Sequence, residues 1–247
     1  MSWVHIREDD GIAIIELSRP KANAFNLDMV GEVLNAVDCL KEHADIRGIV
    51  FSSAQHRFFS SGFDVKEVFA YQEDTMRRFL RSFTDLYETV LRLEKPVVGA
   101  LCGHTIAGGA FLALTFDLRI MTEGDFHFAL NEINFAAVIP PTIQRMLINA
   151  IGPHAAMLMM LSGDAVKPEK ALQLGLVDKV VPQEVVLKEA VASAHILASK
   201  PKDTFCFMKQ SIQRSIGVSN EHQDPAFIDE FLRHWFSPAC VQYRERI

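Results

Sequence analysis

The chain has 247 residues, of which 49% are hydrophobic, so it can bury the core of one large domain or of two small ones. Its net charge of −6 argues against a nucleic-acid-binding surface, and no apolar stretch approaches the length needed to cross a membrane. The first residues lack the basic segment and the apolar run of a signal peptide.

The first half of the sequence alternates strand-like and helix-like segments. Runs of β-type composition predict strands, and a hairpin turn at Asp9-Asp10-Gly11 joins the first two. Apolar residues at helical spacing predict two helices, the first of which Asn26 can cap. The predicted strands cover residues 4–8, 12–17, 48–52, 96–101 and 117–121, and the predicted helices cover residues 29–40 and 71–93.

The second half is predicted to be largely helical. The expected helices cover residues 144–151, 155–161, 168–174, 183–199, 202–216 and 223–236, with a short helix at the end of the chain. A turn and a strand over residues 175–182 interrupt them. Strands first and helices last indicate an α/β fold with a helical C-terminal region. The amphipathic tail, with Phe231 and Trp235, is expected to cover an apolar surface of its own domain or of a neighbouring subunit.

The cysteines do not form a recognisable metal-binding or disulfide pattern. Four cysteines are scattered along the chain without a C-x-x-C pair: Cys39, Cys102, Cys206 and Cys240. They indicate reduced thiols of a cytoplasmic protein, and no metal site is expected.

Two strand-to-helix turns stand out. Gly108-Gly109 follows the predicted strand 96–101 and leads into an apolar helical run. Glycine lets a ligand approach the backbone, and the first N–H groups of a helix have no intrahelical acceptor. Such a turn can bind an anion or stabilise an oxygen that becomes negative during a reaction. Close packing of helix and strand is the alternative. Ser60-Ser61-Gly62, before Asp64, repeats the pattern, and an ordinary turn is the alternative there.

Four groups of residues occur together in the order and nearly the spacing of one protein family. They are Arg19-Pro20 with Asn23-Ala24; Phe59-Ser60-Ser61-Gly62-Phe63-Asp64; Lys95-Pro96 to His104 with Ala107-Gly108-Gly109 and Asp117; and Asn131-Glu132 with the run from Ala171 to Asp178. On these residues the chain resembles the crotonase superfamily of enoyl-CoA hydratases and isomerases, over nearly its whole length.

The resemblance implies the fold and the partners. The expected fold is a ClpP/crotonase-like spiral of repeated β-β-α units over residues 1–190. A helical region over residues 191–247 is expected to cover the active site and to assemble the chain into a homotrimer or a dimer of trimers. The implied substrate is an acyl-CoA thioester, so coenzyme A arrives as part of the substrate and no separate cofactor is expected. No nucleic-acid or membrane partner is expected.

The resemblance also implies the site residues. The backbone N–H groups of Ser61 and Gly108 are expected to form an oxyanion hole, and Glu132 is expected to be the catalytic acid and base. The remaining residues expected to contact substrate or coenzyme A are Ala22, Phe59, Ser60, Gly62, Phe63, Asp64, Val65, Gly109, Phe111 and Asn131.

The number of carboxylates decides between reactions. Hydratases of the family use two glutamates, but the first of these positions is Phe111 in this chain, while the second is Glu132. One carboxylate suits a 1,3-proton shift that converts a 3-enoyl thioester into a 2-enoyl thioester, and the apolar neighbours of Glu132 are expected to raise its pKa. The sequence therefore predicts an isomerase that transposes a C=C bond.

Other functions stay open. They are hydration, another enolate reaction such as decarboxylation or thioester hydrolysis, and a catalytically silent acyl-CoA-binding protein. Glu132 could also be an ordinary exposed loop carboxylate.

Overall fold

The longest strands of the chain form a mostly parallel sheet. The computed structural model describes residues 2–218 and 225–246. Within them, one sheet has the order β1 (Val4–Asp9), β2 (Ile12–Leu17), β3 (Gly48–Ser53), β5 (Val97–Leu101), β7 (Leu118–Thr122) and β10 (Lys179–Val181). The β1–β2 hairpin is antiparallel and the other pairs are parallel. β2, β3 and β5 are almost entirely buried, as their continuous apolar runs predict.

A second sheet of short strands determines where the site lies. Its order is β4 (Phe58–Ser60), β6 (His104–Ile106), β8 (Phe128–Ala129) and β9 (Ala165–Val166), with β4, β6 and β8 parallel. The sequence did not predict β6, β8 or β9, because two or three residues carry too little periodicity. Because the three parallel strands run in the same direction, the segments that follow them, which carry the predicted site residues, leave the sheet at one edge.

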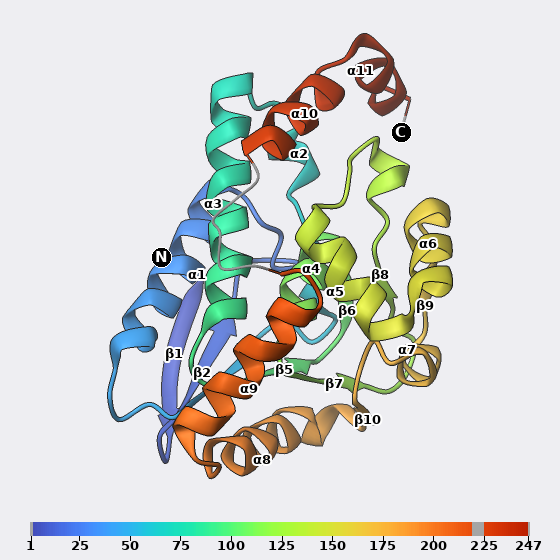
Figure 1. Ribbon diagram of the computed structural model, residues 1–247. Helices are drawn as coiled ribbons and strands as arrows, with labels where there is room; N and C mark the ends of the chain where they lie inside the picture. The colour runs from blue at the N-terminus through green and yellow to red at the C-terminus, as the bar shows by residue number, and fades with distance from the viewer. Residues whose placement is uncertain (1, 219–224, 247) are drawn as a thin grey trace.

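The helices enclose these sheets, as Figure 1 shows. Asn26 caps α1, because its side chain accepts a hydrogen bond of 2.9 Å from the backbone N–H of Met29. The helices are α1 (Leu27–Glu42), α2 (Val65–Val68), α3 (Glu73–Arg92), α4 (Gly108–Leu114), α5 (Pro141–Ile151), α6 (Pro153–Ser162), α7 (Pro168–Leu174), α8 (Val186–Ala198), α9 (Lys202–Ser215), α10 (Pro225–Trp235) and α11 (Pro238–Arg244), with 3₁₀ turns η1 (Glu132–Phe135) and η2 (Gln183–Val185).

The larger sheet, which runs from β1 at one edge to β10 at the other, separates two hydrophobic clusters. The larger cluster joins α1, α3 and α4, and it extends to α10. The smaller one packs α8 against the other face, with Ala190 and Ala194 fully buried. Residue 190, the predicted domain boundary, therefore lies inside a helix that packs on the sheet.

α10 lies against α3 and α2, and α11 continues beyond it, away from α3 (Figure 1). Arg77 of α3 pairs with Asp229 of α10, and the guanidinium of Arg244 stacks 3.9 Å from the ring centroid of Trp235. The helix predicted over residues 223–236 is present from Pro225, and residues 223 and 224 lie outside the described residues. No helix among the described residues is long and apolar enough to cross a bilayer.

Candidate active site

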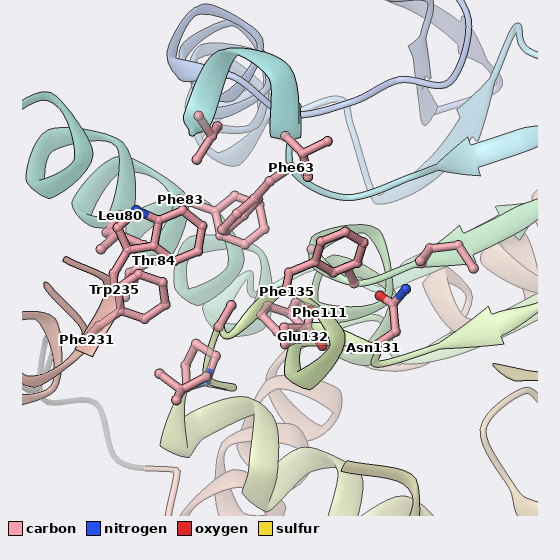
Figure 2. A pocket seen from close by; sticks show the side chains of 18 of the residues that line it. Phe63, Leu80, Phe83, Thr84, Phe111, Asn131, Glu132, Phe135, Phe231 and Trp235 are labelled. Carbon is pink, nitrogen blue, oxygen red and sulfur yellow. The ribbon is translucent and has the colours of Figure 1, made fainter. Parts of the chain in front are cut away.

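A largely apolar cavity of about 330 Å³ lies where α2, α3, α4, η1 and α10 meet. Figure 2 shows its labelled side chains, with Phe231 and Trp235 at one end, Asn131 at the other and Glu132 between them. Phe63, Leu80 and Phe83 supply much of the apolar wall. The lining suits a flexible aliphatic group of a ligand.

Glu132 is buried in this cavity rather than exposed on a loop. It begins η1, its exposed fraction is 7%, and neither carboxyl oxygen has a hydrogen-bond partner among the described residues. Desolvation raises its pKa from 4.5 to about 8, and the effect of its own backbone amide opposes only part of the shift. The expected rise in pKa is confirmed, and a carboxyl group of this kind can exchange a proton near neutral pH.

Phe111 lies in the same cavity, on α4. Its ring is 2% exposed and packs near Phe83, with 6.4 Å between ring centroids. Glu132 is the one acidic side chain among the described residues that line the cavity. The site therefore has a single carboxyl group facing apolar surroundings.

The prediction that the N–H of Ser61 serves the oxyanion hole is wrong for this structure. That N–H donates to the carbonyl oxygen of Ala22 at 3.0 Å, so it is already used. Phe25 forms a parallel bridge with Phe63. The N–H of Phe25 donates to the carbonyl oxygen of Gly62, and the carbonyl oxygen of Phe25 accepts from the N–H of Asp64. Successive N–H groups of an extended chain point to opposite sides. The N–H of Phe63 therefore faces away from Phe25, and it has no acceptor among the described residues.

The turn before α4 supplies a second free donor. Ala107 has φ 50° and ψ −123°, a conformation that residues with a side chain rarely adopt, and it directs the chain into the helix. The N–H of Gly108 has no acceptor within the described part of the chain. A β-carbon at Gly62, whose φ is 83°, would lie 2.9 Å from the Gly108 nitrogen. The two turns therefore touch, and their free N–H groups can converge on one ligand oxygen.

The cavity gathers all three predicted catalytic residues and only some of the predicted contact residues. Ser61, Phe63, Val65, Gly108, Phe111, Asn131 and Glu132 line it, whereas Ala22, Phe59, Ser60, Gly62, Asp64 and Gly109 do not.

The residues outside the lining hold the two turns in place. The hydroxyl of Ser60 donates to Asn23, and Asp64 pairs with Arg19 at 2.7 Å. A β-carbon on Gly109 would lie 2.7 Å from the carbonyl oxygen of Ser60, so Gly109 is needed for close packing. Phe59 is fully buried in the core.

Sequence reasoning missed three contributions to the cavity. Apolar residues at helical spacing predicted the helix that is α3, but that spacing could not show that Thr84 on this helix faces a ligand cavity. The amphipathic tail signalled that Phe231 and Trp235 cover an apolar surface, without indicating which surface. The free N–H of Phe63 depends on pairing with Phe25, which is distant in sequence.

The sequence and the fold match one family. The model of the enoyl-CoA hydratase/isomerase family matches residues 7–242. The chain belongs to this family of enzymes. Its fold also matches the crystal structure of human mitochondrial delta3-delta2-enoyl-CoA isomerase, with a TM-score of 0.94, 24% identity and coverage of 99% of this chain and 96% of the human one. The predicted crotonase fold is thereby confirmed.

Relatives of the chain include proteins named as isomerases and proteins named as hydratases. Mitochondrial enoyl-CoA delta isomerase 1 of Rattus norvegicus is 29% identical over 181 residues, which are 73% of this chain and 63% of the rat protein. Mitochondrial enoyl-CoA hydratase of Pongo abelii is also 29% identical, over 86% of this chain and 72% of that protein. An enoyl-CoA hydratase/isomerase of Xanthobacter autotrophicus is 28% identical, with a TM-score of 0.86 and coverage of 99% and 92%. Overall similarity therefore establishes the family, whereas the type of reaction has to be inferred from the geometry of the site.

Proposed function

We propose that the protein converts 3-enoyl-CoA thioesters into 2-enoyl-CoA thioesters. The observation that carries this proposal is that Glu132 supplies the one carboxyl group among the described residues lining the cavity, with the apolar ring of Phe111 in the same cavity. Hydration of a double bond needs groups that position and activate water as well as a proton donor. An apolar cavity with one acid and base favours moving a proton between carbon atoms of one substrate.

In the proposed reaction the carboxylate of Glu132 removes a proton from C2 of the 3-enoyl thioester. The electron pair of that C–H bond forms a C1–C2 double bond, and the carbonyl π pair moves to the thioester oxygen. The product is a dienolate whose negative charge rests on that oxygen. The N–H groups of Phe63 and Gly108 donate to that oxygen. Glu132 then returns the proton to C4, where the C3–C4 π pair forms the new C–H bond. The C1–C2 π pair moves to C2–C3, the oxyanion re-forms the carbonyl, and no atom is gained or lost. Loss of one such donor typically costs about 3 kcal/mol of transition-state stabilisation.

The acyl chain lies along the apolar wall towards Phe231 and Trp235 in this proposal. The ring of Trp235 packs edge-on against Phe69, and the guanidinium of Arg244 lies over both rings, so these contacts hold the end of the cavity in place. The coenzyme A side of the thioester, here called the carrier, then faces the end of the cavity that holds Asn131 (Figure 2).

We also propose a homotrimer or a dimer of trimers in a reducing, cytoplasmic setting. α9 exposes Phe207, Met208 and Ile212, and α6 exposes Leu158 and Leu161, with exposed fractions of 53–66%. Contact between copies would bury these side chains. The four cysteines are free thiols. Sedimentation analysis tests the assembly, since a monomer at micromolar concentration contradicts it.

The deciding experiment compares Glu132→Gln with Glu123→Gln, a control at an exposed position outside the cavity. We expect Glu132→Gln to lower kcat for 3-enoyl-CoA by about a thousandfold while acyl-CoA still binds, because the amide retains the shape but cannot carry the proton. The control should keep the wild-type rate. Retained turnover in Glu132→Gln would place the base elsewhere.

A further inference from the structure

The side chain of Asn131 is unusual because its amide has no partner. Asn131 occupies the N-cap position of η1, where asparagine commonly accepts a backbone hydrogen bond, yet its side chain makes no such bond. Its Oδ1 is buried and unpartnered, and no acceptor for Nδ2 exists among the described residues. An unpaired buried amide oxygen is unfavourable. The group is therefore available to a partner that the chain itself does not supply.

The position of Asn131 indicates which part of a ligand it would meet. Figure 2 shows Asn131 and Trp235 at opposite ends of the cavity, with Glu132 between them. If the acyl chain extends towards Trp235 and its C2–C4 segment lies at Glu132, the group beyond the thioester sulfur lies towards Asn131. This step rests on the proposed function.

The chemistry of the pantetheine arm of coenzyme A indicates which of its groups Asn131 would contact. Beyond the sulfur, the pantetheine arm continues with two methylene groups and then a secondary amide, whose N–H is the first hydrogen-bond donor along the arm. We propose that Oδ1 of Asn131 accepts this N–H, and that Asn131 thereby selects thioesters of pantetheine over thioesters without the amide.

Rotation of the side-chain amide makes this contact reachable. Neither amide atom of Asn131 is held by a hydrogen bond among the described residues, so a half-turn about Cβ–Cγ can exchange the positions of Oδ1 and Nδ2 at low cost. Nδ2 is not enclosed as Oδ1 is, so the exchange would bring the acceptor to the more accessible side.

The competing interpretation gives Asn131 a different task. Asn131 precedes Glu132 directly, and both residues carry unpartnered buried oxygens. Asn131 could act on the carboxyl group of Glu132 and orient its proton. That role would change the pH dependence of turnover and would not depend on the carrier, which separates the two interpretations.

The test measures binding of two saturated ligands that cannot isomerise. One is the octanoyl thioester of N-acetylcysteamine, which contains the amide, and the other is the octanoyl thioester of 2-acetoxyethanethiol, in which oxygen replaces N–H. Calorimetry on the wild-type protein should show about tenfold tighter binding of the amide, the effect of one hydrogen bond to a buried acceptor. Asn131→Leu should bind both ligands equally.

A matched control is Asn134→Ala, in the same 3₁₀ turn. Its side chain donates to Gly163 at 3.5 Å and does not line the cavity, so this variant should keep the tenfold preference. Equal binding of both ligands by the wild-type protein overturns the proposal without any variant. It is also overturned if Asn131→Leu keeps the preference. A further contrary result would be that this variant loses turnover equally on the 3-octenoyl thioesters of N-acetylcysteamine and of 2-acetoxyethanethiol, with a shifted pH profile.

These outcomes are separate from the outcome for the proposed reaction. Both ligands are saturated, so the preference is measured whether or not 3-enoyl thioesters turn over. Preference with no isomerisation refutes the reaction alone, and isomerisation without the preference refutes the role of Asn131 alone.

Discussion

Gly62 and Gly108 meet with no side chain between them. A β-carbon at Gly62 would lie 2.9 Å from the Gly108 nitrogen and 2.7 Å from the β-carbon of Ala107. The two turns that carry the free N–H groups of Phe63 and Gly108 are therefore in direct backbone contact, and their spacing depends on the absence of one methyl group.

The first prediction concerns this contact. Gly62→Ala should lower the free energy of unfolding by about 2 kcal/mol, because Gly62 has φ 83° and the new methyl group clashes with backbone. It should also lower kcat by about a hundredfold, because the two N–H groups separate. Thermal unfolding and turnover of 3-enoyl-CoA measure the two effects.

Gly31→Ala is the matched control. Gly31 lies within α1, and nothing stands within 4 Å of its β-carbon position. Alanine should stabilise this helix by about 0.5–1 kcal/mol and leave turnover unchanged. Wild-type turnover in Gly62→Ala would show that the turns do not set the spacing of the donors.

The second prediction concerns pH. Glu132 must be ionised to remove a proton, and its pKa is about 8 in the free protein. Below that pH the ionised fraction rises about tenfold per pH unit. We therefore expect kcat/KM to rise with pH and to level off above about 8, since this parameter reports the free enzyme. Initial rates from pH 6 to 9, with circular dichroism to verify folding, test this. A flat or falling profile would exclude Glu132 as the base.

The third prediction adds a second carboxyl group. Phe111→Glu should raise hydration of crotonyl-CoA at least about tenfold over the wild-type protein, because two carboxyl groups can share the deprotonation of water and the protonation of carbon. It should also destabilise the fold by about 3 kcal/mol, because a 2% exposed ring is replaced by a polar group.

Phe111→Gln distinguishes charge from space. It places an uncharged group of similar size at the same position, so it should suffer a similar loss of stability without the gain in hydration. If the wild-type protein already hydrates crotonyl-CoA quickly, the argument from one carboxyl group fails. Formation of the 3-hydroxyacyl product is the measurement.

The fourth prediction concerns the end of the cavity. Trp235→Ala should shift the preferred acyl chain to greater length, since removal of the 3% exposed indole extends the apolar space. The loss of the ring and of its stacking with Arg244 should cost about 3 kcal/mol. A series of kcat/KM values against chain length tests this, with Ile196→Ala as a control on the exposed face of α8. An unchanged preference would mean that the acyl chain ends elsewhere.

Much of the lining of the candidate site could be predicted from sequence, because it is local. Gly108 is recognisable from the strand-to-helix turn around it, and Glu132 from its motif and its apolar neighbours. Phe111 was found by counting from Gly108 to the position at which the resemblance implies a glutamate in hydratases. In each case the residue type and a short spacing carry the information.

The remaining features of the site and of the fold depend on contacts between segments that are distant in sequence. The choice between the N–H groups of Ser61 and Phe63 follows from pairing with Ala22 and Phe25, some forty residues earlier in the chain. The strand His104–Ile106 exists because Phe58 and Phe128 lie beside it. Spacing within one segment cannot reveal such pairing, since the same residues are compatible with a loop.

The position of α10 has a consequence for synthesis. The strands and turns that carry Gly108 and Glu132 emerge from the ribosome well before Trp235, which closes the cavity. A nascent chain that has formed both sheets would still expose the apolar walls of an open groove. The interval before α10 docks is therefore when this protein should depend most on chaperones, and that dependence should increase in variants that weaken the pair between Arg77 and Asp229.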